Sequence, residues 1–466
     1  MQIVDANMTP GEPAEGPRDR RTVGDGLTRL PVPTSPRSIR ETGLDAALLN
    51  ELALKATFLA GRTHLHVLAA RLKLSVAVLN EVLAFLVAEH LVEIARRGAS
   101  DMDVEYQLTA LGKQRAAECM LRNRYAGPAP VTLEAYRVVV ERQSVRQIRV
   151  TRADVVAAFS DCTLRQQLQD QVGAAMNSGR PLFLYGPPGS GKTFLAERLG
   201  RLLQGEVLIP HAIAVDNQII QVFDPLVHAE VAVDPHDRPL AAASADARWA
   251  LCRRPLVLTG GELTLSALDM RLDRNAGYYQ APPQFKANNG IFIVDDLGRQ
   301  PMSPAALMNR WIVPLDRGCD HFSLHTGHRF QVPFDVRLVF STNMAPHTLA
   351  DESFLRRLGY KIHVGALAED EYRAVFRHHC AETGVQFEES AFRFLVENLH
   401  ARQARPMLAC HPRDLLGIVI DHAKYAGLQP AMELEALQRA WFSYFAAAPS
   451  RHERSEDGTM DDRRKT

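Results

Sequence analysis

The sequence lacks the features that mark membrane-spanning, secreted and strongly basic proteins. No apolar run approaches the roughly 18 residues that a helix needs to cross a bilayer, and the first residues lack the charged and apolar regions of a signal peptide. Lys and Arg together number 54, as do Asp and Glu, so the formal net charge is zero. We therefore expect no membrane partner, and any contact with nucleic acid would depend on a local basic patch.

Cysteine is sparse, with six residues in a chain of 466, and no two of them form a C-x-x-C pair. This spacing fits neither a disulfide framework nor a zinc site, so we expect reduced thiols in a cytoplasmic protein. With 46% hydrophobic and 23% charged residues, the composition is that of ordinary globular material. The length suggests about two to four domains.

One glycine-rich segment matches the phosphate-binding loop G-x-x-x-x-G-K-[ST] at every fixed position. Its residues are Gly186, Pro187, Pro188, Gly189, Ser190, Gly191, Lys192 and Thr193. The apolar run 181–185 predicts a strand before the loop, and residues 193–203 predict a helix after it. Glycines let the backbone approach a phosphate closely, and the helix N-terminus adds free N–H groups and a positive dipole end. We expect this loop to bind ATP, with Lys192 on the β and γ phosphates and Thr193 on Mg²⁺.

A second motif follows at residues 290–296, where an apolar run ends in Asp295 and Asp296. A buried strand that ends in paired carboxylates has the form of a Walker B motif, which would bring the acids beside the bound phosphates. We expect Asp295 to hold Mg²⁺ through water, and Asp296 to orient and polarise the attacking water. An ordinary buried strand that ends at an Asp-rich turn is the alternative.

A third apolar run, residues 336–340, predicts a strand whose tip reads Ser341-Thr342-Asn343. A polar residue at such a tip, beside a Walker B strand, resembles sensor 1 of the AAA+ ATPases, which implies that Asn343 faces the nucleotide. The resemblance covers about residues 156–446. It implies an α/β fold in which helices flank a parallel P-loop sheet.

Two arginine-containing segments extend this resemblance. Residues 351–357 resemble the arginine-finger segment of the superfamily, which implies that Arg356 or Arg357 reaches the γ-phosphate of a neighbouring subunit and stabilises the transition state. Residues 411–416 resemble sensor 2, which implies that Arg413 opens a helix and points back to the nucleotide. Each arginine alone could be a surface charge, but together they occur in the AAA+ order and spacing.

Residues 277–291 and 307–315 are similar to the MoxR-like and magnesium-chelatase-like branch, in which an inserted hairpin faces the ring pore. As a whole, the chain resembles a bacterial group described as predicted ATPases with chaperone activity. Tyr278 and Tyr279 either line such a pore or pack in a core, and packing is the commoner role of an aromatic pair.

The Walker B motif departs from the family pattern. In AAA+ ATPases it usually ends in Asp-Glu, whereas here it ends in Asp295-Asp296. Aspartate is one methylene shorter than glutamate, and misplacing a catalytic group by about 1 Å can lower a rate about 10²-fold. Slow hydrolysis is one expectation, and a main chain that lies closer to the nucleotide and so compensates is the other.

Upstream, three amphipathic segments and short strands at 91–94 and 104–108 resemble a winged helix-turn-helix domain. Its candidate recognition helix, residues 75–89, contains no Lys or Arg, and Asn80 is its one good base reader. This composition favours a protein-contact or regulatory role over DNA reading. Flanking basic residues could still touch a DNA backbone, namely Arg62, Arg71, Lys73, Arg96 and Arg97.

These patterns divide the chain into six segments. Proline-rich sequence at the start and Arg/Glu/Asp-rich sequence at the end predict disorder, and helical periodicity predicts the lid. The segments are a disordered tail (1–40), a winged helix-turn-helix domain (44–120), a linker (121–155), an AAA+ α/β nucleotide-binding domain (156–366), a helical lid (367–446) and a second disordered tail (447–466).

The resemblance implies an ATP hydrolase that assembles as a ring, which we expect to be a hexamer, because an arginine finger requires a neighbour. ATP hydrolysis would drive the remodelling of a protein client that the sequence does not identify. The alternatives are an ATP-gated DNA-binding regulator, a nucleotide switch with little turnover, and a kinase that uses the same loop. Two sensors and a lid would have no purpose in a kinase.

Overall fold

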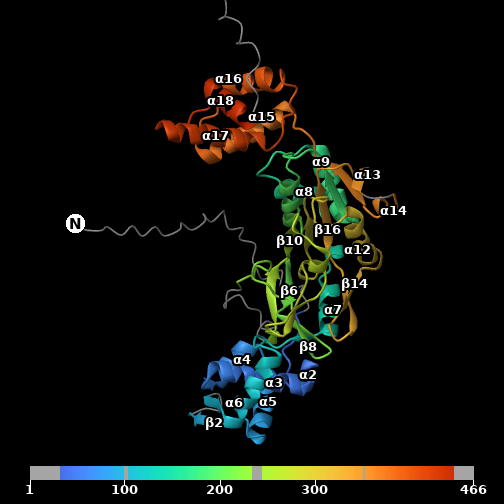
Figure 1. The fold of residues 1–466 in the computed structure, drawn as a ribbon, viewed down its shortest axis with the longest axis vertical. Helices are drawn as coiled ribbons and strands as arrows, with labels where there is room; N and C mark the ends of the chain where they lie inside the picture. The colour runs from blue at the N-terminus through green and yellow to red at the C-terminus, as the bar shows by residue number, and fades with distance from the viewer. Residues whose placement is uncertain (1–31, 99–102, 233–243, 350–351, 446–466) are drawn as a thin grey trace, which may run out of the picture.

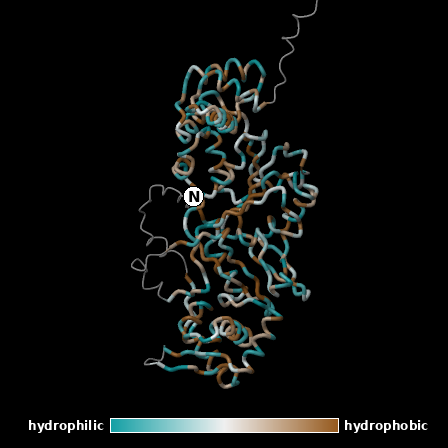
Figure 2. The backbone as a smooth tube through the Cα atoms, turned by 60° about the vertical axis from the view of Figure 1, so that its left-hand side comes forward, coloured by the Kyte–Doolittle hydropathy of each residue, from teal (hydrophilic) through white to brown (hydrophobic). Residues whose placement is uncertain are grey.

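The computed structural model describes residues 32–98, 103–232, 244–349 and 352–445. The predicted second tail, 447–466, and most of the first lie outside these ranges. Along its long axis the chain forms an N-terminal helical region, a mixed β region, a parallel sheet with flanking helices and a C-terminal helical region (Figure 1). Apolar segments, brown in Figure 2, run through the middle of the molecule.

The N-terminal region consists of helices around an antiparallel sheet of order β1-β3-β2. Its elements are α2 (Ile39–Thr42), α3 (Ala46–Ala60), β1 (Thr63–His64), α4 (Leu65–Leu72), α5 (Val76–Ala88), β2 (Val92–Arg97), β3 (Val104–Leu108) and α6 (Ala110–Arg122). Hydroxyl caps begin three of the helices. The side chain of Ser38 accepts from the N–H of Glu41, that of Ser75 from Val78 and that of Thr109 from Gly112. The three amphipathic segments and the strands β2 and β3 occur in the order that the sequence predicts, whereas it does not predict α2 and β1.

The predicted N-terminal tail extends too far along the chain. The N–H of Ser35 donates to the carbonyl of Ser244 at 2.7 Å, and Val32 packs against an apolar core of the mixed β region. Helix α2 then begins at Ile39. Proline-rich sequence without periodicity indicates disorder locally, but residues 32–40 are held by a segment that lies far away in the sequence.

The segment predicted as a linker, 121–155, is built into the fold. Strand β4 (Val131–Thr132) pairs in parallel with β7 (Ala212–Val215), which places β4 at the edge of a five-stranded sheet in the mixed β region. Helix α7 (Leu133–Arg142) packs against the same sheet. A 3₁₀ turn (Val145–Gln147) and α8 (Arg152–Ala158) lead on to the parallel sheet. These elements are short, and their partners come from distant segments, so local sequence does not reveal their pairing.

Strands within residues 156–366, the segment predicted as the nucleotide-binding domain, also belong to this mixed β region and not to the parallel sheet. Strand β6 (Glu206–Pro210) pairs antiparallel with β9 (Trp249–Arg253), and β7 (Ala212–Val215) lies in a sheet of order β11-β12-β8-β7-β4. The other strands of the region are β8 (Gln218–Gln221), β11 (Arg271–Asp273), β12 (Tyr278–Gln280), β14 (Cys319–Ser323) and β15 (Arg329–Pro333). Local strand propensity does not specify which strand will be the partner.

The two adjacent tyrosines on β12 pack within the chain, which is the second of the two expectations for them. Tyr279 is buried in the core of the mixed β region. The ring of Tyr278 meets that of Tyr125 edge to face, with centroids 5.3 Å apart.

The parallel sheet has five strands in the order β10-β13-β16-β5-β17. The strands are β5 (Leu182–Tyr185), β10 (Leu256–Thr259), β13 (Ile291–Val294), β16 (Arg337–Thr342) and β17 (Tyr360–His363). The helical segments of this part are α9 (Gln166–Ser178), α10 (Lys192–Arg198), a 3₁₀ turn (Leu199–Leu202), a second one (Leu265–Leu268), α11 (Pro283–Lys286), α12 (Pro304–Arg317), α13 (Pro346–Leu349) and α14 (Glu352–Leu355). Buried residues pack on both faces of the sheet, as expected of parallel strands that helices cover.

The C-terminal region is all helical, as the sequence predicts. It comprises α15 (Glu369–Thr383), α16 (Glu389–Phe394) with a π-helical turn (Leu395–His400), α17 (His411–Ala426) and α18 (Leu434–Phe445). Its own core includes Tyr372, Phe376 and Trp441. Within the described ranges, no helix of the protein combines the length and the apolar character needed to cross a membrane.

A buried ion pair in the mixed β region gives a test of this packing. The Arg248 guanidinium donates to Asp246 at 2.8 Å and to the carbonyl of Pro130 at 3.1 Å, and the two charged side chains are 6% and 3% exposed. We expect Arg248→Ala to lower the free energy of unfolding by about 3–5 kcal/mol, because it leaves Asp246 buried without its partner. Denaturant titration measures this loss. The exposed Arg253→Ala is the control, and an equally small loss in both variants would contradict the prediction.

Candidate phosphate-binding site

The glycine-rich loop joins the end of β5 to the start of α10. Gly186, Gly189 and Gly191 have φ values of 152°, 78° and 94°, a region that favours glycine. A Cβ atom on Gly186 would lie 2.0 Å from the carbonyl oxygen of Val364. The loop therefore needs glycine both for its backbone conformation and for its close packing.

Lys192 is folded into this loop. Its Nζ donates to the carbonyl oxygens of Gly186 at 3.1 Å and Pro187 at 2.8 Å. Burial lowers the pKa of Lys192, and the nearby carboxylates of Asp295 and Asp296 oppose this shift. The ammonium group thus lies beside both the loop and the paired acids.

Strand register brings the two motifs together at one edge of the sheet. Val294 of β13 lies opposite Phe340 of β16, and Thr342 of β16 lies opposite Tyr185 of β5. The loop, the paired acids and Asn343 all follow directly on these strands, so they share the carboxyl edge. Ligands of open α/β sheets bind in the crevice outside this edge, where the strand order is not consecutive.

A hydrogen bond connects the loop to the Walker B motif. The hydroxyl of Thr193 donates to Oδ2 of Asp295 at 2.6 Å, and the N–H of Asp295 donates to the carbonyl of Thr259 on β10 at 2.8 Å. A hydroxyl and a carboxylate are oxygen ligands of the kind that Mg²⁺ prefers, and Mg²⁺ usually takes its other ligands from water and phosphate. In the part of the chain that is described, no cluster of three or more His, Cys, Asp or Glu side chains forms an all-protein metal site.

Asp296 lies in a tightly held turn. Its φ is 48°, and its Oδ1 accepts from Nδ2 of Asn343 at 3.3 Å. Gln300, which the sequence analysis missed, donates from Nε2 to the carbonyls of Gly260 at 3.1 Å and Asp295 at 3.0 Å. A glutamine four residues after the paired acids is the sequence signal for it.

The C-terminal helical region touches the loop directly. The N–H of Cys410 donates to the carbonyl of Gly189 at 3.0 Å, and a Cβ atom on Gly189 would lie 2.5 Å from Sγ of Cys410. Arg413 lies in the first turn of α17, just after this contact, but its side chain is 72% exposed and pairs with Asp414 at 3.0 Å. The structure thus brings the start of α17 to the loop, while the guanidinium of Arg413 pairs with the adjacent Asp414.

Arg356 and Arg357 lie at the opposite edge of the sheet from the loop. They precede β17, and the N–H of Gly359 donates to the carbonyl of Pro181 just before β5. The four residues of β5 span about 13 Å, so neither arginine lies at the loop of its own chain. Arg357 donates to both oxygens of Asp316 at 3.0 Å, whereas Arg356 is exposed.

Residues 368–443, in the C-terminal helical region, match a family model described as Domain of unknown function (DUF8689). Among curated proteins, no sequence matches the chain.

Similar solved structures include two of NtrX from Brucella abortus. The first has a TM-score of 0.39 and 14% identity, and it covers 62% of this chain and 56% of that chain. The second, in complex with ATP, has a TM-score of 0.30 and 15% identity, and it covers 59% of this chain and 66% of that chain. The chain thus spans less than two thirds of the length of either, and TM-scores this low do not establish a common fold.

The contact between loop and helical region predicts the effect of enlarging one glycine. We expect Gly189→Ala to displace Cys410, because the new Cβ would overlap its sulfur atom. Hydrogen exchange of the Cys410 amide should accelerate about tenfold or more, which corresponds to ~1.4 kcal/mol.

Gly205→Ala is the matched control, because Gly205 has a φ of 88° and a Cβ atom added there would meet no other atom within 4 Å. Both substitutions place alanine in the left-handed region, so they share the backbone strain. Equal exchange of the Cys410 amide in the two variants would mean that the contact does not hold this segment in place.

Proposed function

We propose that the chain binds ATP with Mg²⁺ at the loop 186–193 and hydrolyses it. The observation that carries the proposal is the Thr193–Asp295 hydrogen bond, which joins loop and Walker B motif at the carboxyl edge of the sheet. Lys192 lies beside both. Such a site offers a cation and helix N–H groups for phosphates and oxygen ligands for a metal.

Each residue of the site would have a separate task. Thr193 and Asp295 would hold Mg²⁺, which neutralises charge on the phosphates. Lys192 would leave the loop carbonyls for the β and γ phosphates. Asp296, held by Asn343, would orient the attacking water.

We further propose that the chain is an AAA+ ATPase that works as a ring, with a hexamer as the expected size. The order of the motifs and a helical region that contacts the loop support this assignment, with residues 367–446 as the lid. Arg356 is the better candidate for the arginine finger, because Arg357 is engaged by Asp316. Since both lie at the far edge of the sheet, a finger would have to act on a second copy, as in a head-to-tail assembly.

The proposed work is remodelling of a protein client, with residues 44–120 as a winged helix-turn-helix contact domain. The exposed side of α5 carries Ala77, Asn80, Glu81, Ala84 and Phe85, and it has no basic residue. Arg71, one of the flanking residues that could touch DNA, donates instead to the carbonyl of Ala126 at 3.2 Å. These features favour a protein over a DNA duplex as the partner.

A nucleotide switch with little turnover is the second candidate, and the short Asp296 side chain favours it. Steady-state ATP turnover per subunit across a protein concentration series separates the two. We expect turnover that rises with concentration and is lost in Asp296→Asn, while nucleotide binding persists. Binding without turnover in both proteins would favour the switch.

A mixing experiment tests the arginine finger. We expect Arg356→Ala to lower turnover about 10³-fold or more, by loss of charge stabilisation in the transition state, and Lys192→Ala to be inactive through loss of nucleotide binding. Mixed together, the variants should recover turnover, because the Lys192→Ala chain still supplies Arg356 to a neighbour's loop.

Arg377→Ala, which removes an exposed arginine of the C-terminal helical region, is the matched control and should keep its turnover. A mixture that stays inactive although both variants assemble would exclude an action of Arg356 across the subunit boundary.

A further inference from the structure

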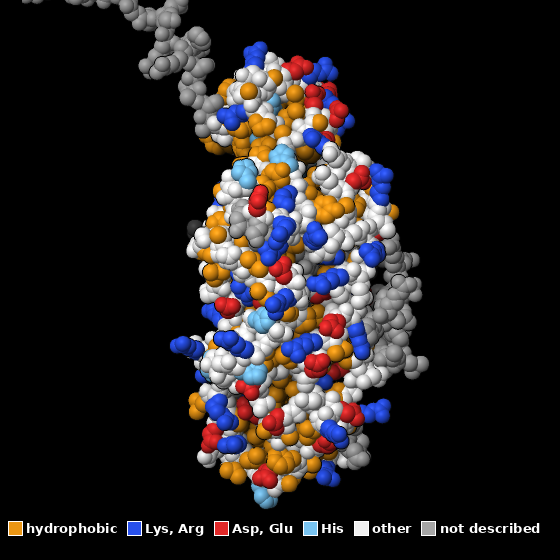
Figure 3. Space-filling view, turned by 90° about the vertical axis from the view of Figure 1, so that its right-hand side faces the viewer, with side chains coloured by type: hydrophobic (Ala, Val, Ile, Leu, Met, Phe, Trp, Pro, Cys, Tyr) orange, Lys and Arg blue, Asp and Glu red, His pale blue; other side chains and the backbone are white. Residues whose placement is uncertain are grey.

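A cationic cavity of about 330 Å³ lies at the amino edge of the parallel sheet, opposite the phosphate-binding loop. It is bounded by the residues that precede β5 and β16, the last turn of α12 and the segment before β17. Lys and Arg side chains, blue in Figure 3, are prominent in the middle of the face that carries α12 and α14. The charged residues that line the cavity are Arg146, Arg180, Arg337, Arg356, Arg357 and Asp316.

Two of these five arginines form ion pairs. Arg357 pairs with Asp316 at 3.0 Å, and Arg146 lies 3.8 Å from Asp335. Within the described ranges, the side chains of the remaining three form no ion pair, and these are Arg180, Arg337 and Arg356. The cavity therefore holds a surplus of positive charge around a space that is open to solvent.

Arg337 is the most unusual of the three, because it is 5% exposed. Its guanidinium donates to the carbonyl of Val145 at 3.2 Å, and its Nε has no hydrogen-bond partner. Burial lowers the pKa of Arg337, which the charge of Asp335 opposes. A buried cation without a paired anion is costly, so a bound anion would offset the cost.

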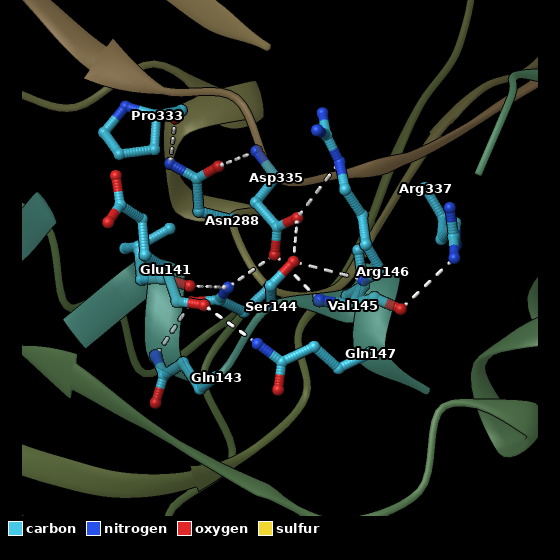
Figure 4. Close-up of polar contacts among 12 residues, drawn as sticks. Glu141, Gln143, Ser144, Val145, Arg146, Gln147, Asn288, Pro333, Asp335 and Arg337 are labelled. Atoms are coloured by element: carbon cyan, nitrogen blue, oxygen red, sulfur yellow. Dashed lines mark hydrogen bonds and ion pairs between the residues drawn. The ribbon is translucent and has the colours of Figure 1, made fainter. Parts of the chain in front are cut away.

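Asp335 acts on Arg337 through its charge but forms no ion pair with it, and other donors engage its oxygens (Figure 4). It accepts from Ser144 Oγ at 2.7 Å and from Val145 N–H at 2.8 Å. It also accepts from Asn289 Nδ2 at 2.7 Å. The same contacts fix the backbone beside Arg337. Gly179, at a φ of 73°, leaves room for this guanidinium, because a Cβ there would lie 3.2 Å from its Nη1.

We propose that this cavity binds a phosphate-bearing anion, at a site separate from the phosphate-binding loop. The planar guanidinium fork matches phosphate oxygens in pairs, and three arginines without a carboxylate partner surround one space. The volume lies at the lower end of the range for small-ligand pockets. The anion is a free polyphosphate; the phosphate chain of a nucleotide held by a second copy, which the proposed arginine finger already invokes, is the rival source with the same chemistry of recognition.

The test uses the full chain carrying Lys192→Ala, which removes binding at the loop, and titrates it with inorganic pyrophosphate by calorimetry without divalent cations. We expect one pyrophosphate per chain, and a dissociation constant at least tenfold weaker when Arg180→Gln is added. Arg152→Gln is the matched control, because it removes the same charge from an exposed residue outside the cavity. Arg146→Gln serves as a second exposed variant should Arg180→Gln impair folding.

The outcomes separate the two sources of the anion. Binding that is independent of protein concentration and lost in Arg180→Gln identifies a free polyphosphate. Absence of pyrophosphate binding, with nucleotide-dependent self-association of the wild-type chain weakened by Arg180→Gln, would overturn the proposal and leave these arginines to the proposed contact with a second copy. If Arg180→Gln and Arg146→Gln change neither quantity, the proposal is overturned, and the proposed ATP turnover at the loop is unaffected by that result.

Discussion

The register of three adjacent parallel strands is the constraint on which the candidate site depends. Because β13, β16 and β5 end at the same edge, a hydroxyl from one motif and a carboxylate from another meet within hydrogen-bond distance. A shift of one residue in either pairing would turn side chains to the other face of the sheet. The buried strands and the helices that cover them hold that register, so the chemistry of the edge rests on the packing of the core.

The two edges of this sheet have opposite electrostatic character. Paired acids and a lysine lie at the carboxyl edge, whereas arginines surround a cavity at the amino edge. Such asymmetry suits a head-to-tail association, in which one edge of a chain meets the other edge of the next. At the amino edge, Asn289 and Asp335 bond the starts of β13 and β16 to the loop that leaves α7, so the mixed β region braces the strands that carry the site.

The hydrogen bond between Cys410 and Gly189 connects the C-terminal helical region directly to the loop. A phosphate that drew Lys192 away from its two backbone carbonyls would change the loop on which this contact rests. Movement of the helical region with the state of the loop is the conformational step that the proposed ATPase would use.

Local sequence alone determined the glycine-rich loop, the apolar strands on either side of the Walker B acids, and the helices at both ends, because these depend on residue type and on periodicity over a few turns. It also placed Asp295 and Asn343 at strand ends, and Thr193 at the start of the helix after the loop. Only the tertiary structure decided that β6 and β7 lie outside the parallel sheet, that residues 121–155 form part of the fold, that Gln300 braces the acidic turn and that Arg356 lies far from its own loop. Each of these depends on which distant segments pair, and strand pairing is set by packing against partners that no local pattern names.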